Sequence, residues 1–338
     1  MRAQAAGTPP VASVIIPTRN RCALLRELIE SLWKQTLDPA KFEIIVMDNQ
    51  SSDGTAEMMA ELQRISPGAL AFHVMKENKG PIHSRNAGAR MARGPILAFT
   101  DSDCRATPKW LERGLEPFNA PDVAFVSGSV LDKPEQSVHF FSFRNGAVPG
   151  AENFTYPACN ILFRKEIFWQ MCGFDEGEYV RDIGDKPIEC ADTDLAWRIR
   201  KMGRANVYVD EAVVYHEVTS MTPWAWLKSQ WRVVMVPLAV RLHPELKEKL
   251  CWWGPFFRAE NLLFYLALAG LVGSVAVNGW LALVAIPYAF HGLTIPGTKF
   301  SVARIPRLAF RTLVLALRQT VICAALIYGS VRTRTLIL

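Results

Sequence analysis

Three short apolar runs, each followed by polar residues and then by a helical pattern, open the chain. They are Val11 to Ile16, Phe42 to Met47 and Leu70 to Met75. Unbroken apolar runs of this length are typical of strands in a parallel sheet, because both faces of such a sheet are covered. The helical patterns predict helices over 23–37, over 55–65 and from the residues after Asn78. Together they predict strand–helix repeats of an α/β fold, which bring the polar residues to one edge of the sheet.

A fourth apolar run, Ile96 to Phe99, predicts another strand, and two carboxylates follow it. These are Asp101 and Asp103, separated by one serine. Hard divalent cations prefer carboxylate oxygens and often share them with the phosphates of a substrate. Because Asp and Ser are also common turn residues, the pattern alone leaves open a metal site and a solvated turn.

Polar segments after the second and third strands suit a nucleotide. The acidic, Ser-rich loop 48–55 could bind a ribose or base, or it could form an Asx turn that caps the next helix. Lys79, His83 and Arg85 are cations that suit a diphosphate, although a solvated basic helix face would look the same. These repeats predict a nucleotide-binding parallel sheet. The chain has no GxGxxG segment, so a dinucleotide fold is not indicated.

The second half of this region adds strands over 123–130, 205–209 and 213–215, helices from 165 and over 196–203, and a loop-rich stretch over 132–157. Asp192 and Asp194 stand at or just before the first turn of the second helix, with Glu189 nearby. One carboxylate would cap the helix, and the other is a candidate general base. His216 could complete a metal site begun by carboxylates, or be structural.

The C-terminal part is apolar. Asn261 to Val277 and Trp280 to Leu293 carry no charge; the first reaches the lower length limit of a membrane helix and the second falls short of it. A hairpin or re-entrant pair therefore fits as well as two spans. The apolar segment from Leu308 to Val331 carries Arg311 and Arg318 on one face, which favours an interfacial or bundle-facing helix. A soluble helical subdomain or a dimer interface is the alternative.

Composition supports a membrane-associated protein. Of the 338 residues, 50% are hydrophobic and 10 are Trp, and several Trp and basic residues fall together between 221 and 255. The net charge of +6 suits anionic headgroups or phosphorylated substrates better than nucleic acid. The seven cysteines form no CxxC pair or zinc spacing, as expected of reduced cytosolic thiols. The first residues have no apolar stretch, so we expect no signal peptide and a cytoplasmic globular part.

Eight motifs, in this order, resemble the family 2 glycosyltransferases of the GT-A fold, membrane-associated bacterial type. They are Val14–Asn20, Asp48–Thr55, Asn78–Gly80 with Arg85–Gly88, Asp101–Asp103, Asn160 with Phe163–Arg164, Gly173–Glu176, Asp192–Leu195 and His216. The resemblance implies an α/β fold: a Rossmann-like, nucleotide-binding mixed sheet with flanking helices, followed by C-terminal apolar helices. We expect a flexible N-terminus over 1–10, the GT-A domain over 11–220, an amphipathic interfacial helical linker over 221–255 and membrane-associated helices over 256–338.

The resemblance also implies the reaction, which is transfer of one sugar from a nucleotide diphosphate sugar with inversion at the anomeric carbon. Such a single displacement needs a base on the acceptor side and no enzyme nucleophile. Asp192 matches the family's base, and Asp101, Asp103 and His216 match ligands of Mn²⁺ or Mg²⁺. The implied nucleotide-sugar-binding residues are Pro17, Thr18, Asn20, Asp48, Lys79, Arg85, Asp101 and Ser102. Asn160 and Asp194 are placed on the acceptor or donor-sugar side.

The chain departs from the family pattern at two positions. Ala191 replaces the usual Glu before Asp192, and Asn49 replaces a common second Asp in the nucleotide loop. Both leave the donor sugar and the acceptor geometry open. The processive synthases of the family carry Gln-x-x-Arg-Trp, whereas Ser229–Arg232 has these residues in another order, which favours a non-processive enzyme.

The expected partners are a nucleotide diphosphate sugar, UDP-sugars first, and a lipid-linked or glycan acceptor used in envelope or exopolysaccharide synthesis. We expect no nucleic acid. The expected location is the inner membrane, with the catalytic domain in the cytoplasm. The alternative function is a catalytically silent subunit that binds a nucleotide sugar or acts as a scaffold in a membrane complex.

Overall fold

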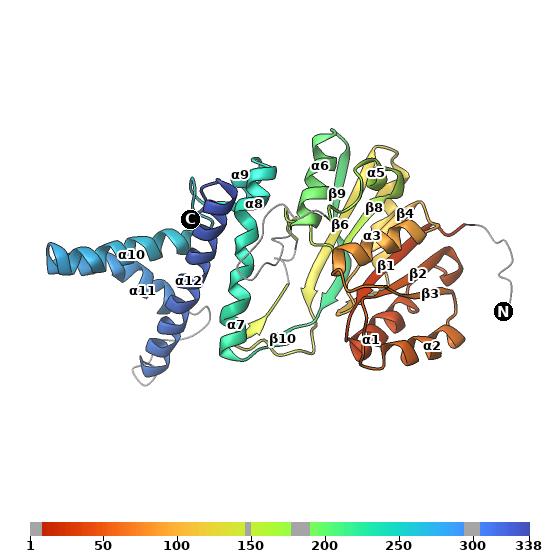
Figure 1. The fold of residues 1–338 in the computed structure, drawn as a ribbon, viewed down its shortest axis with the longest axis horizontal. Helices are drawn as coiled ribbons and strands as arrows, with labels where there is room; N and C mark the ends of the chain where they lie inside the picture. Colours follow the sequence, from red (N-terminus) through yellow and green to blue (C-terminus); the bar gives the residue numbers. More distant parts are fainter. Residues whose placement is uncertain (1–8, 146–149, 177–189, 294–304) are drawn as a thin grey trace. The chain divides into compact units, whose positions relative to one another are not determined.

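A computed structural model describes residues 9–145, 150–176, 190–293 and 305–338 (Figure 1). Two compact units are present, and each is considered by itself. The N-terminal unit comprises the described residues up to 176 together with 191–220, and the C-terminal unit comprises Cys190 with 221–293 and 305–338. Every predicted site residue lies in the N-terminal unit.

An eight-stranded sheet forms the centre of the N-terminal unit. The four predicted apolar runs form β1 (Ala12–Thr18), β2 (Phe42–Asp48), β3 (Ala69–Val74) and β4 (Ile96–Phe99). The other strands are β5 (Cys104–Ala106), β6 (Val123–Asp132), β8 (Ile161–Arg164) and β9 (Ala205–His216). Their order is β3-β2-β1-β4-β8-β6-β9-β5. A separate antiparallel pair joins β7 (Ser142–Phe143) to β10 (Thr219–Ser220).

The sheet is parallel in its first half and mixed in its second. β1, β2, β3 and β4 all run the same way. β8 runs antiparallel to both of its neighbours, β4 and β6, and β5 runs antiparallel to β9. The strand–helix repeats therefore correctly predict a parallel first half. The mixed sheet as a whole is the one implied by the GT-A resemblance.

Helices cover both faces of the parallel half, as the unbroken apolar strands require. Val14 and Ile16 of β1 belong to a core shared with α1 (Cys22–Leu32) and α2 (Thr55–Ile65). Ile15 points the other way, toward α3 (Pro81–Met91), where a Cβ added to Gly88 would lie 2.7 Å from Ile15 Cγ2. This close approach holds α3, which carries Arg85, directly against the sheet (Figure 1).

The first helix is shorter than predicted. The pattern predicted a helix over 23–37, but α1 ends at Leu32. Beyond it, the Gln35 side chain donates to Thr107 O at 2.7 Å, and Thr36 N donates to Pro108 O at 2.8 Å. These bonds to a distant loop replace the helical ones, so tertiary contacts override the local helical pattern.

The remaining helices of this unit are α4 (Trp110–Leu115), α5 (Lys165–Gln170) and α6 (Ala191–Lys201), with short 3-10 helices η1 (Pro39–Lys41) and η2 (Glu116–Asn119). α6 begins five residues earlier than predicted, so Asp192 and Asp194 both lie in its first turn. The two predicted strands over 205–209 and 213–215 are one strand, β9, whose pairing with β6 shifts register at Gly128.

The C-terminal unit is helical. Its elements are α7 (Pro223–Ser229), η3 (Gln230–Val234), α8 (Met235–Leu242), α9 (Leu246–Leu250), α10 (Ala259–Ala276), η4 (Gly279–Ala285), α11 (Ile286–Leu293) and α12 (Ile305–Thr333). By length and composition, α10 and residues 310–333 of α12 could each cross a membrane. Both predicted long apolar helices are therefore present, which is consistent with membrane association.

Two details refine the predictions for this unit. The apolar run after Asn278 is divided between η4 and α11, and the Asn278 side chain accepts a hydrogen bond from Trp280 N at 3.0 Å. Arg318 of α12 lies 3.7 Å from Glu260 and donates to Gln230 Oε1 at 3.1 Å. It therefore faces other helices of its unit, as predicted for a bundle-facing helix.

A buried carboxylate joins the first two strands to the loop before β4. Glu43 Oε1 accepts from Ser13 Oγ and from Arg93 N, both at 2.6 Å, and Oε2 accepts from Arg93 Nε at 2.8 Å. Burial alone would raise the pKa of Glu43, but these donors outweigh it and lower the pKa below its ordinary value of 4.5. The ionised form is therefore the one that stabilises the fold.

We expect Glu43→Ala to destabilise the N-terminal unit by about 2–4 kcal/mol, because it leaves buried donors without a partner. The measurement is the thermal unfolding midpoint of the full chain in detergent. Glu61→Ala, which breaks only the exposed pair with Arg26, is the matched control and should leave the midpoint near the wild-type value. Equal midpoints for the two variants would contradict this role.

The advantage of wild type over Glu43→Gln should depend on pH. A lowered native pKa stabilises the folded state above the unfolded pKa, and the contribution disappears as the pH falls through the native pKa. We therefore expect the difference in midpoint to be full at neutral pH and to shrink below about pH 4.5, the ordinary value for this group.

Candidate active site

A cavity of about 360 Å³ opens where β1, β2 and β4 end. Parallel register brings Thr18 beside Asp48, so the residues after the strands meet at one edge of the sheet. Five of the predicted nucleotide-sugar residues line this cavity: Pro17, Thr18, Arg85, Asp101 and Ser102. Thr18 Oγ1 is buried and has no hydrogen-bond partner among the described residues, which leaves it available to a ligand.

The other predicted nucleotide-sugar residues lie outside the cavity lining. Asp48 accepts hydrogen bonds from Ser51 N and from Ser51 Oγ within its own loop. It does not cap the next helix, whose N-cap is Gly54 without a side-chain hydrogen bond. Asn20, in a left-handed conformation, accepts from Ser52 N at 2.8 Å. Lys79 pairs with Glu77 at 3.1 Å. Asp48 and Asn20 together fix the two loops that border the cavity, while direct nucleotide contact by these three residues stays a prediction.

Four polar residues of the lining were not predicted as site residues. They are Arg19, Arg21, Asn49 and Asn78. The amides of Asn49 and Asn78 lie 2.5 Å apart, beside the Arg19 guanidinium. Arg19, Asn49 and Asn78 stand inside motifs already recognised, so their positions in the sequence could have indicated them. Arg21 stands one residue beyond its motif, and its role depends on a contact with Asp103 on the fourth strand's loop.

A largely buried arginine, Arg85, lines the cavity and interacts electrostatically with the candidate base. Arg85 donates to Asp101 Oδ1 at 2.5 Å. Burial acts to lower the pKa of Arg85, but the charges of Asp101 and Asp192 outweigh it and raise the pKa. Arg85 therefore stays charged and interacts electrostatically with one carboxylate from each of the two acidic centres.

Asp192 is held by backbone amides at the start of α6. Its Oδ1 accepts from Thr193 N at 2.8 Å and its Oδ2 accepts from Ala158 N at 3.1 Å. Burial raises the pKa of Asp192, although Thr193 N–H and the charge of Arg85 act in the opposite direction. The residue is still partly exposed. A rigid, partly exposed carboxylate with a raised pKa suits a general base.

The second carboxylate of this centre has a structural partner. Asp194 is buried and accepts from Arg198 Nε at 2.8 Å, one helical turn away. Arg198 also donates to Gly173 O at 3.0 Å, which ties α6 to a neighbouring loop. The structure therefore separates the two candidates, and Asp192 is the more available. Glu189 lies outside the described residues.

Asn160 is also fully engaged within the protein. It accepts from Trp110 Nε1 at 2.8 Å and donates to Ser129 O and Ala212 O, both at 2.8 Å. These bonds join α4 to two strands of the mixed half. The prediction that Asn160 and Asp194 lie on the acceptor or donor-sugar side is not tested by these contacts.

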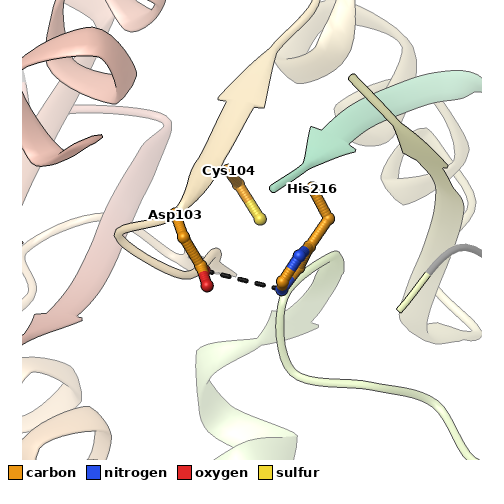
Figure 2. Close-up of side chains that lie close together, drawn as sticks. All are labelled: Asp103, Cys104 and His216. Carbon is orange, nitrogen blue, oxygen red and sulfur yellow. Dashed lines mark ion pairs between the residues drawn. The ribbon is translucent and has the colours of Figure 1, made fainter. Parts of the chain in front are cut away.

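Three candidate metal ligands come together at the start of β5 and the end of β9 (Figure 2). Asp103, Cys104 and His216 are all buried, and their ligand atoms lie within 4.8 Å of one another. Asp103 Oδ1 lies 3.5 Å from His216 Nε2 and has no hydrogen-bond partner among the described residues. The structure thus brings together two of the three predicted metal ligands. Asp101 is paired with Arg85 and is not a member of this group.

The donor atoms of this group fit a divalent cation. His216 Nδ1 lies 3.0 Å from Glu217 O, which places the ring proton on Nδ1 and leaves the lone pair of Nε2 facing Asp103. An unpartnered buried carboxylate oxygen and an imidazole nitrogen suit Mn²⁺ or a similar ion. Cys104 was not predicted as a ligand, because its proximity to His216 depends on the pairing of β5 with β9.

Two relatives are similar to the chain over most of its length. The chain is 35% identical over 232 residues to the glycosyltransferase AglE of Haloferax volcanii, covering 67% of this chain and 72% of the relative. It is 26% identical over 311 residues to the glucosyl-dolichyl phosphate glucuronosyltransferase of the same organism, covering 83% of this chain and 96% of the relative.

Solved structures share the fold. The mannosyltransferase PcManGT from Pyrobaculum calidifontis, in complex with GDP-Man and Mn²⁺, superposes with a TM-score of 0.57 at 18% identity, covering 97% of this chain and 90% of the other. S. aureus TarS 1–349 in complex with UDP gives a TM-score of 0.50 at 16% identity, covering 93% and 90%. The glycosyl transferase family 2 domain model matches residues 13–172. Together with the relatives, this match shows that the chain belongs to the family 2 glycosyltransferases.

Proposed function

We propose that this glycosyltransferase is metal-dependent and inverting, and that it adds one sugar from a nucleotide diphosphate sugar to a lipid-linked acceptor at a membrane. The observation that carries the proposal is the position of Arg85. It pairs with Asp101 at the donor cavity, and its charge also acts on Asp192, the candidate base, so one arginine influences both the leaving-group side and the base.

The donor side suits a diphosphate. Arg19, Arg21 and Arg85 line the cavity, and guanidinium groups bind phosphate oxygens through paired hydrogen bonds. A volume of about 360 Å³ is within the usual range of small-molecule pockets. The solved neighbours bind GDP-Man and UDP, so both bases belong among the donors to be tested, with UDP-sugars first.

The reaction needs one displacement. Asp192 accepts the proton of the acceptor hydroxyl, and the hydroxyl oxygen bonds to the anomeric carbon on the face opposite the nucleotide. The bond from that carbon to the phosphate oxygen breaks, and its electron pair stays on the leaving nucleotide diphosphate. Arg85 and the neighbouring arginines stabilise the charge that develops there. A divalent cation held by Asp103 and His216 would add Lewis-acid stabilisation of that charge.

The proposal of a lipid-linked acceptor is based on the C-terminal unit. Large apolar side chains are exposed on α10 and the segment after it, including Val272, Val275 and Trp280. A bilayer would cover such a surface, and a membrane-bound enzyme would meet a lipid-linked acceptor there. One relative is named for a glucosyl-dolichyl phosphate acceptor, which supports the same chemistry here. The basic residues near α12 favour a cytoplasmic catalytic unit at an inner membrane, in envelope or exopolysaccharide synthesis.

The test is a two-dimensional screen of donors and acceptors. The full chain in detergent is incubated with UDP-, GDP- and dTDP-sugars, each with polyprenyl-phosphate-linked sugars or with matched soluble oligosaccharides. We expect one donor to give a lipid-linked product extended by one sugar, and lipid acceptors to be preferred. Transfer only to soluble acceptors would contradict the lipid-linked acceptor, and addition of several sugars per binding event would contradict a non-processive enzyme.

A further inference from the structure

The group of Asp103, Cys104 and His216 contains a thiol to which the family resemblance gives no role. We propose that Cys104 is a ligand of the divalent cation and that its sulfur makes the site prefer thiophilic ions, such as Co²⁺, Zn²⁺ and Cd²⁺, to Mg²⁺. This inference rests on the metal site of the proposed function and adds to it the class of metal ion.

The backbone places the three residues together. Cys104 is the first residue of β5, and in the antiparallel ladder it stands directly opposite His216 at the end of β9. Glu217 N donates to Asp103 O at 3.0 Å, which extends the same pairing by one residue on each side. The three side chains therefore lie on a rigid part of the sheet, as a preorganised ligand set requires.

The donor atoms are directed toward one another. Asp103 Oδ2 pairs with Arg21, which leaves Oδ1 facing His216 Nε2 without a hydrogen-bond partner among the described residues. Glu217 O orients the imidazole. Asn145 Nδ2 lies 2.9 Å from Nε2 and can donate to its lone pair, so a bound cation would replace this amide at Nε2. Sulfur, oxygen and nitrogen atoms within 4.8 Å of one another form a ligand set typical of transition metals.

A buried cysteine is often only a small apolar residue, and Cys104 also packs in the core beneath the sheet. Its neighbour Cys159 is likewise buried. What distinguishes Cys104 is that its sulfur shares a site with an unpartnered carboxylate oxygen and an imidazole. Cys159 belongs to no such group within the described residues, so it is the matched control.

The chemistry of binding separates the two interpretations. A thiolate, not a thiol, coordinates a metal ion, so the cation replaces the proton of Cys104 and one proton passes to solvent. Thiolate ligands favour Zn²⁺ and related ions, whereas Mg²⁺ prefers oxygen ligands. A purely apolar Cys104 would give neither proton release nor this preference.

The test uses the full chain in detergent, freed of metal by a chelator and titrated with Co²⁺ without any donor. We expect a sulfur-to-cobalt charge-transfer band in the wild type and in Cys159→Ser, and its loss in Cys104→Ser. We also expect Co²⁺ affinity to fall at least about tenfold in Cys104→Ser, while Mg²⁺ affinity is nearly unchanged. Thermal unfolding of the metal-free variants checks folding, and Cys104→Ala replaces Cys104→Ser if the latter does not fold.

Three results would overturn the proposal: cobalt bound by the wild type without a charge-transfer band, an unchanged band in Cys104→Ser, or no cobalt binding by the wild type. Because the readout is a metal spectrum without sugar transfer, its failure leaves the transferase activity untouched. Failure of the sugar-transfer screen would likewise leave the cobalt result intact.

Discussion

We expect Asp192→Asn to lower kcat by roughly 10²–10⁴-fold, because an amide cannot take the proton of the acceptor hydroxyl. Its size matches that of Asp, and it can still accept from Thr193 N or from Ala158 N, so α6 should stay in place. Donor affinity should change little. Steady-state kinetics give kcat, and calorimetry with the nucleotide sugar gives the donor Kd. Glu116→Gln, which alters an exposed carboxylate on η2, is the control for handling and folding.

The pH profile gives a second measurement of the same group. Burial raises the pKa of Asp192 above its ordinary value of 3.8, and the base is active only when ionised. The rate should therefore fall as the pH decreases through this raised value, and the fall should begin at a higher pH than for an ordinary Asp. The residual rate of Asp192→Asn should lack this acid limb. An unchanged limb, or an unchanged kcat, would show that another group is the base.

Asp103→Asn should have the second large effect, on metal binding. The substitution replaces an anionic ligand by a neutral one and removes the ionic partner of Arg21. We expect metal affinity to fall by at least about 10–100-fold, since even changes behind the first ligands have effects of this size. Donor binding should weaken at the same time and should no longer respond to EDTA. Metal titration followed by a thermal shift, with and without nucleotide sugar, measures both.

The matched control is Asp122→Asn, an exposed carboxylate before β6. It should keep wild-type metal affinity and EDTA sensitivity. If Asp103→Asn keeps them as well, Asp103 is not a ligand. If donor binding to the wild type is unchanged by EDTA, the metal has no part in holding the donor.

The fold of the N-terminal unit could be predicted well from the sequence, because apolar runs covered on both faces leave a clear signal. Val14 and Ile16 face one set of helices and Ile15 the other, so no polar position interrupts the strand. The end of α1 could not be predicted. It is set by bonds from Gln35 and Thr36 to a loop about seventy residues away, and helical periodicity carries no information on such contacts.

The candidate site likewise contains residues that the sequence predicts and residues that it does not. Asp101 follows the end of β4, and Arg85 lies in the N-terminal half of α3 at the same sheet edge. The structure places them in contact, as their positions in the sequence predict. Arg21 and Cys104 were missed, since each becomes notable only through a partner from another segment, Asp103 for the first and His216 for the second. The register of β5 against β9 spans more than a hundred residues and has no local signature.

The contacts of Arg318 favour one of the two open interpretations of α12. Arg311 and Arg318 predicted either an interfacial or a bundle-facing helix, and Arg318 contacts Glu260 and Gln230 inside its unit. An arginine paired with a carboxylate can be held within an apolar bundle at a much lower cost than an isolated one. The apolar length alone could not distinguish these arrangements.

The anomeric configuration of the first product tests the account most directly. With the donor and acceptor found by screening, proton NMR of the product at early times gives the configuration of the new glycosidic bond. A single displacement by the acceptor, with Asp192 as base, predicts a product inverted relative to the nucleotide sugar, and almost none from Asp192→Asn. A product that retains the donor configuration would contradict the account, because it requires a second displacement and an enzyme nucleophile.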